Sequence, residues 1–162
     1  MPRIELALVA TIAAFAGLLL LVRPHPSPPP SPYCRGGNPL AGVYHSPRLD
    51  VKKRCAVAEG VVTRVKFEEF DGDVHLGLRT DGGDDLVVEV IPQDRGVVPI
   101  PDTGAHVTVV GPSVWDTTHR WAEIHPAWWI SAGRIVPASS EELSRVESLL
   151  RDTQGEPEVR HD

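Results

Sequence analysis

The feature that most constrains the fold is a series of short segments in which apolar and polar residues alternate, separated by turns rich in glycine and aspartate. A period of two places successive side chains on opposite faces of a strand, so each segment is expected to be a β-strand. In the first segment, Val61, Val65 and Phe67 are expected to share the inward face. Five segments show the pattern, at residues 58–67, 71–80, 85–91, 106–111 and 120–126.

This pattern predicts a small all-β domain. Short strands joined by glycine-rich turns are typical of a sandwich or a barrel. Five strands favour a closed barrel of the oligonucleotide/oligosaccharide-binding (OB) type, and we expect it over residues 56–137. Gly60 and Gly77 fall inside predicted strands, where a bulge or bend would curve the sheet.

A single helix is predicted after the barrel, over residues 138–152. Ser139 followed three residues later by Glu142 is a capping-box pattern, which marks a helix N-terminus. One apolar stripe follows it, formed by Leu143, Val146, Leu149 and Leu150. The polar residues 153–162 are expected to be a disordered tail.

The N-terminus carries an apolar run at residues 4–22, with Glu5 as its one charge. A run of this length can span a bilayer as a helix, and no small-x-small cleavage site follows it. We therefore predict a signal anchor at residues 1–23 that holds the protein in the cell membrane as a single-pass protein. A cleaved signal with secretion is the alternative, and a lipoprotein modified at Cys34 is a third. Arginines flank both ends of the run, so charge alone does not set its orientation.

Two segments separate this anchor from the barrel. Residues 24–32, PHPSPPPSP, are expected to be a polyproline linker. Residues 33–55 form a lead-in bounded by Cys34 and Cys55. If the C-terminal domain is extracytoplasmic, these two cysteines should form a disulfide; two unpaired thiols are the alternative. Their spacing does not suit a zinc site.

Charge argues against nucleic acid as a partner. The chain has a net charge of −6, and residues 56–137 carry 13 acidic against 6 basic side chains. Proteins that bind nucleic acids usually present a basic stripe to the phosphates. An OB-fold protein that binds single-stranded DNA remains an alternative, because aromatic side chains can stack on bases. The candidates for stacking are Trp115, Trp121, Trp128 and Trp129.

A polar cluster is expected where two of the predicted strands meet. On a strand, His119, Trp121, Glu123 and His125 share one face. Asp73 and His75 are expected on the outward face of residues 71–80. If these strands approach one another, imidazole nitrogens and carboxylate oxygens converge, and this donor set suits a divalent metal such as zinc.

The candidate ligand-binding residues are Asp71, Asp73, His75, Asp116, His119, Trp121, Glu123 and His125. The candidate metal ligands among them are His75, His119, Glu123 and His125. The alternative is a buried polar network, in which Asp71 and Asp116 cap turns. No activated nucleophile is evident and no catalytic residue is predicted, which favours a binding module or a structural module of the cell envelope over an enzyme.

Three motifs carry a resemblance to a known family. They are D-G-D-x-H, with Asp71, Asp73 and His75; V-x-G-x-x-V-x-D, with Gly111 and Asp116; and H-x-W-x-E-I-H-P, which runs from His119 to Pro126. Over residues 42–130 the chain resembles an uncharacterised family of small, mostly exported bacterial OB-like domains. The resemblance implies an OB-like fold and export, and it implies no activity.

Overall fold

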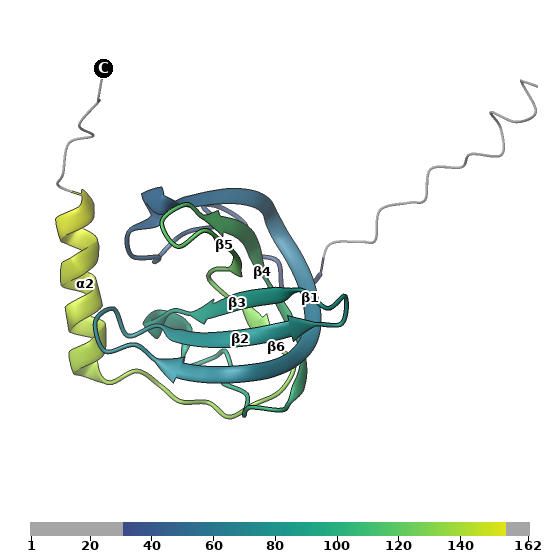
Figure 1. The fold of residues 1–162 in the computed structure, drawn as a ribbon. Coiled ribbons are helices and arrows are strands. Elements are labelled where there is room, and N and C mark those ends of the chain that lie inside the picture. The colour runs from purple at the N-terminus through teal and green to yellow at the C-terminus, as the bar shows by residue number, and fades with distance from the viewer. Residues whose placement is uncertain (1–30, 155–162) are drawn as a thin grey trace, which may run out of the picture.

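The computed structural model describes residues 31–154 (Figure 1). The predicted signal anchor, nearly all of the proline-rich linker and the residues after 154 lie outside the described residues. Across residues 31–154, no helix has the length and apolar character needed to cross a membrane.

The domain is mostly β, with one helix at its C-terminal end, as the alternation predicts. All five predicted strands are present, and the sixth, β6, has only two residues, too few to show a period. The strands are β1 (Leu49–Phe67), β2 (Val74–Thr80), β3 (Asp85–Val90), β4 (His106–Asp116), β5 (Trp121–Ile124) and β6 (Trp129–Ile130). The helices are the short 3-10 helices η1 (Ser46–Arg48) and η2 (Pro92–Asp94) and the α-helix α2 (Ser140–Gln154).

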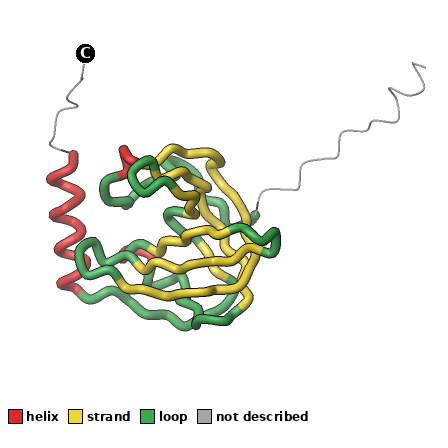
Figure 2. The backbone as a smooth tube through the Cα atoms, viewed as in Figure 1, coloured by secondary structure: helices red, strands yellow, loops and turns green. Residues whose placement is uncertain are grey.

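The strands form one mixed sheet in the order β1-β2-β3-β5-β4-β6. Strand β1 also pairs with β4, so β1, β2, β3, β5 and β4 make a partial ring, drawn in yellow in Figure 2. The β3–β5 pairing is parallel and short, whereas the other pairings are antiparallel. The ring brings residues from β2, β3 and β5 next to one another.

Strand β1 serves both sides of the ring, because its first half pairs with β4 and its second half with β2, and the two pairings overlap at Gly60. This residue is aligned with Thr80 of β2 and with Val107 of β4. A Cβ atom at Gly60 would lie 2.2 Å from the Arg79 carbonyl oxygen, so only glycine fits there. Strand β1 begins at Leu49, inside the range predicted to be the lead-in. The prediction began the strand too late because the polar first half of β1 shows no apolar alternation.

The inward face of β1 differs from the prediction. Val61 is 39% exposed and Phe67 is 43% exposed, whereas Val62 is 1% exposed and belongs to the core. Val65, the third of the predicted residues, does pack against the core, because a bulge between Val62 and Arg64 gives β1 one more residue than β2 and brings Val65 to the face of Val62. An extra residue moves later side chains to the opposite face, and a regular period of two cannot reveal it.

The core lies inside the ring. Its buried side chains include Val62, Leu76, Leu78, Val88, Val109, Ile124 and Ile130. A smaller cluster attaches the lead-in to the ring and includes Val43, Leu49, Ile91 and Val114. The predicted disulfide between Cys34 and Cys55 is present and joins the lead-in to β1. A disulfide of this kind suggests an extracytoplasmic domain.

Helix α2 begins with the predicted capping box. The Glu142 amide donates to Ser139 Oγ at 3.2 Å, and the Ser139 amide donates to Glu142 Oε2 at 2.7 Å. Arg95 lies 2.7 Å from Glu142 Oε1 and links the helix to the loop after η2. The Ser139 amide and Arg95 together lower the pKa of Glu142 to about 2. Of the predicted apolar stripe, Val146 is buried and Leu143 is exposed.

Candidate metal centre

The largest concentration of buried charge lies where β2, β3 and β5 meet. It consists of Asp73, Glu89, Glu123 and His125, whose exposed fractions run from 0% to 3%. We call these four residues the buried cluster. Ionisable groups are seldom buried to this extent unless they are paired or bind a metal.

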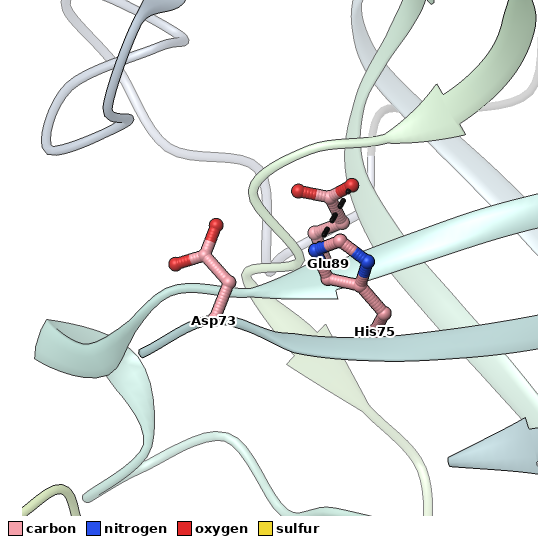
Figure 3. Close-up of side chains that lie close together, drawn as sticks. All are labelled: Asp73, His75 and Glu89. Carbon is pink, nitrogen blue, oxygen red and sulfur yellow. Dashed lines mark ion pairs between the residues drawn. The ribbon is translucent and has the colours of Figure 1, made fainter. Parts of the chain in front are cut away.

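Strand register places the members contributed by β2 and β3. Asp73 lies in the turn just before β2, where its amide donates to Asp71 Oδ1 at 3.3 Å. His75 of β2 is aligned with Glu89 of β3, so their side chains lie on the same face of the sheet. Figure 3 shows Asp73, His75 and Glu89 close together, with the His75–Glu89 ion pair dashed.

Strand β5 contributes the other two members. Glu123 lies on β5 opposite Val87 of β3, and His125 follows directly after the strand. Gly111 of β4 allows this segment to approach closely, because a Cβ there would lie 2.4 Å from the Pro126 carbonyl oxygen. The glycine in the V-x-G motif therefore helps to place His125.

His125 is the centre of the buried cluster. Its Nδ1 atom lies 2.9 Å from Glu89 Oε2 and 3.3 Å from Glu123 Oε2. Its Nε2 atom lies 3.5 Å from Asp73 Oδ2. The other oxygen of Glu123, Oε1, accepts a hydrogen bond from Trp121 Nε1. The imidazole thus faces a carboxylate on each of its two nitrogen atoms.

His75 lies at the rim of the buried cluster. Its side chain is 21% exposed, and its Nε2 atom lies 3.4 Å from Glu89 Oε1. Its Nδ1 atom lies 3.6 Å from Glu68 Oε1, on the outer side. The two oxygens of Glu89 therefore face two different histidines.

Two buried atoms of this site lack a hydrogen-bond partner. Among the residues described, Glu89 Oε2 and His125 Nε2 are the buried side-chain atoms in this condition, although charged groups lie near both. Their neighbours are close, but the angles do not make hydrogen bonds. Unsatisfied buried polar atoms are costly and need a partner, and an ion bound beside Glu89 Oε2 would supply one to that oxygen.

The pKa values follow from burial and from the charge of His125. Burial raises the pKa of Asp73 from 3.8 to about 6, although His125 opposes the effect. Burial acts the same way on Glu89, but there the charge of His125 outweighs it and the pKa is lowered. Burial alone would lower the pKa of His125, yet the Glu89 charge and the other two carboxylates hold it well above 6.5.

Negative charge is in excess within the buried cluster. It contains three carboxyl groups and one imidazole. No lysine or arginine in residues 31–154 forms an ion pair with any of its members. A cation of higher charge would be stabilised there more strongly than a proton.

The geometry could hold a metal ion. Donor atoms from Glu89, Glu123 and His125 all lie within 4.8 Å of one another, and so do donor atoms from Asp73, His75 and Glu89. Both cysteines form the disulfide, so the donors are imidazole nitrogens and carboxylate oxygens. This set suits zinc and other divalent transition metals.

The structure brings together four of the predicted residues: Asp73, His75, Glu123 and His125. It places His119 elsewhere, in an ion pair with Asp116 at 2.8 Å, stacked on Trp121. The chain turns before β5 begins at Trp121, so His119 does not lie on the strand face as predicted. Its side chain is 50% exposed.

Asp116 and Asp71 accept hydrogen bonds in turns, as the structural alternative predicts. Asp116 accepts from the Thr118 and His119 amides at 2.7 and 2.8 Å. Arg48 Nε lies 2.8 Å from its other oxygen. Burial would raise the pKa of Asp116, but the hydrogen bonds from His119, Arg48 and Thr118 hold it well below its usual range.

Two residues of the site were missed by sequence reasoning. Glu89 lies in the segment DLVVEVI, which shows no alternation that would mark its face. The available signal was a lone carboxylate inside an apolar, β-branched run, where a charge is costly. Glu68 follows β1 directly, and nothing in the sequence separates it from its neighbour Glu69.

No protein-family model matches this sequence, and a search of curated proteins finds no match either. The function is therefore argued from the geometry of the buried cluster.

Proposed function

We propose that this OB-like domain is an extracytoplasmic binding module that holds a divalent transition metal, such as zinc, in the buried cluster. Glu89, Glu123 and His125 are the ligands of that ion. The metal serves to neutralise and order the junction of β2, β3 and β5, and the module carries it outside the cytoplasm.

The observation that carries the proposal is the arrangement of donor atoms around His125 Nδ1. Glu89 Oε2 and Glu123 Oε2 lie 2.9 and 3.3 Å from it. Each remaining atom faces an outer partner: Trp121 donates to Glu123 Oε1, Asp73 faces His125 Nε2, and His75 faces Glu89 Oε1. Metal-binding histidines and carboxylates commonly have such outer partners, which orient them toward the ion.

The charge balance supports the same assignment. Without metal, the raised pKa of His125 keeps its ring protonated, and one positive charge faces three carboxyl groups. A divalent ion would replace that proton and add a second positive charge. Calcium is less suitable, because it prefers six to eight oxygen ligands and does not use imidazole.

We propose further that residues 4–22 anchor this module to the cell membrane. The support is the long apolar run, the proline-rich segment after it, and the disulfide of the domain. The acidic balance of residues 56–137 argues against nucleic acid as the ligand.

Calorimetric titration of the purified full-length chain with Zn²⁺ tests the metal site. We expect tight binding that His125→Ala and Glu123→Gln both abolish while circular dichroism remains that of a folded β-protein. His106→Ala is the matched control, because His106 is exposed and ion-paired with Asp81, outside the buried cluster. If Zn²⁺ does not bind, the cluster is a structural network and the proposal is wrong.

A further inference from the structure

We infer that the site binds two metal ions, with Glu89 as the bridging ligand between them. This inference rests on the proposed function, since it adds a second ion beside the one held by Glu123 and His125. The second position is formed by Glu89, His75 and Asp73.

The two oxygens of Glu89 are directed to two different imidazoles. Oε1 lies 3.4 Å from His75 Nε2, and Oε2 lies 2.9 Å from His125 Nδ1. A carboxylate that gives one oxygen to each of two ions holds them close together, as in sites where two metals lie about 3.5–4 Å apart. With a single ion, one Glu89 oxygen and the imidazole that it faces would not bind metal.

The second position has its own set of donors. Donor atoms of Asp73, His75 and Glu89 lie within 4.8 Å of one another, and this group shares one residue, Glu89, with the group around His125 Nδ1. Asp73 and Glu89 are buried, so the set is directed inward rather than spread over an exposed acidic surface. Imidazole with two carboxylates is again a donor set for zinc or manganese.

The orientation of His75 is that of a metal ligand. While Nε2 faces Glu89, Nδ1 lies 3.6 Å from Glu68 Oε1, and Glu68 is held in turn by Lys66 at 2.6 Å. A carboxylate on the far nitrogen of a ligand histidine fixes the ring and its tautomer.

His125 Nε2, which is buried without a hydrogen-bond partner, is a further observation beside the second position. It is directed toward Asp73, whose Oδ2 lies 3.5 Å away without a hydrogen bond. In the doubly occupied site, Asp73 gives one oxygen to the second ion and can accept the Nε2 proton with the other. This satisfies the atom that the metal-free arrangement leaves without a partner.

Charge permits both ions. Three carboxylates of the cluster carry three negative charges, and one divalent ion neutralises two of them. The remaining negative charge and that of Glu68, beside His75, attract the second ion, so that four carboxylates face two divalent ions. Because His75 and Glu68 are partly exposed, that ion lies near solvent, where water completes its coordination. We therefore expect the inner ion to bind more tightly and the outer ion to exchange faster.

Metal counting after equilibrium dialysis of the purified full-length chain against Zn²⁺ tests the inference. We expect two equivalents for the unmodified chain and one for His75→Ala. Glu68→Gln should weaken the outer ion roughly 10- to 100-fold and leave the inner ion unchanged. Glu59→Gln and His106→Ala are the controls, since both residues are exposed and outside the site, and they should retain two equivalents.

Electron paramagnetic resonance of the Mn²⁺-loaded chain tests the bridge itself. Two Mn²⁺ ions bridged by Glu89 give an exchange-coupled spectrum. In Glu68→Gln at limiting Mn²⁺, we expect the spectrum of an isolated ion. This variant provides the test even if His75→Ala does not fold. If the unmodified chain binds one equivalent of metal, the second site is wrong and the proposed function stands. The same conclusion follows if a second equivalent binds but neither His75→Ala nor Glu68→Gln affects it. Two uncoupled ions overturn the bridge. No bound metal overturns both proposals.

Discussion

The Nδ1 atom of His125 lies 2.9 Å from Oε2 of Glu89, and both side chains are almost completely buried. The two residues come from segments that are far apart in the sequence, and the parallel pairing of β3 with β5 brings them together. The hydrogen bonding of these two side chains is incomplete, because Glu89 Oε2 and His125 Nε2 lack hydrogen-bond partners.

Replacing His125 with alanine should strongly destabilise the metal-free domain. The substitution leaves three buried carboxyl groups without their one positive partner, and removing one member of a buried ion pair costs about 3–5 kcal/mol. Urea unfolding in the presence of a chelator measures the loss. His106→Ala should change the free energy of unfolding by less than about 0.5 kcal/mol, since His106 is exposed. Equal effects of the two substitutions would contradict this prediction.

The pKa of Asp73 predicts a pH dependence with a definite sign. Burial raises this pKa from 3.8 to about 6, so the folded state binds the proton more tightly than the unfolded state. The stabilisation from this group is fully present below pH 3.8 and is lost as pH rises to about 6. Asp73→Asn removes this dependence, so the variant should gain stability relative to the unmodified chain over that interval. Urea unfolding of both proteins from pH 4 to pH 7 without metal measures the difference, and a constant difference would refute it.

Asp116 should stabilise the fold without contributing to metal binding. Asp116→Asn removes the carboxylate that faces Arg48 and His119, and we expect a loss of about 1.5–3 kcal/mol. Because the pKa of Asp116 is held below its usual range, this contribution is present above about pH 4 and decreases in more acidic solution. Urea unfolding at pH 7 and pH 3 measures it. Zinc affinity should remain unchanged in both Asp116→Asn and His119→Ala. A tenfold loss of affinity in either variant would show that Asp116 or His119 contributes to the metal site.

Zinc affinity should rise with pH through the neutral range. The pKa of His125 is raised well above 6.5 in the metal-free protein, so the ring must release a proton before Nδ1 can bind the ion. Calorimetry in buffers of different ionisation enthalpy gives the number of protons released. Affinity independent of pH between 6 and 8, with no proton release, would show that His125 is not a ligand.

The strands and the helix could be predicted from local patterns, because alternation and the capping box are properties of neighbouring residues. The bulge after Val62 could not be predicted, since it is a property of the pairing of β1 with β2 and has no signal in the sequence of β1 alone. In the site, Glu123 and His125 were predicted from their motif. Glu89 was not, because its role depends on the β2–β3 register and the β3–β5 pairing. His119 lies outside the site because it precedes β5, in the turn that ends at Arg120.

X-ray absorption of the zinc-loaded full-length chain tests the central claim most directly, because it reports the atoms around the ion. We predict a shell of nitrogen and oxygen at about 2.0–2.1 Å with no sulfur near 2.3 Å. We also predict imidazole scattering that decreases in His125→Ala and not in His106→Ala. Imidazole scattering that is unchanged in His125→Ala, or zinc that dialysis removes completely from the unmodified chain, would contradict that claim.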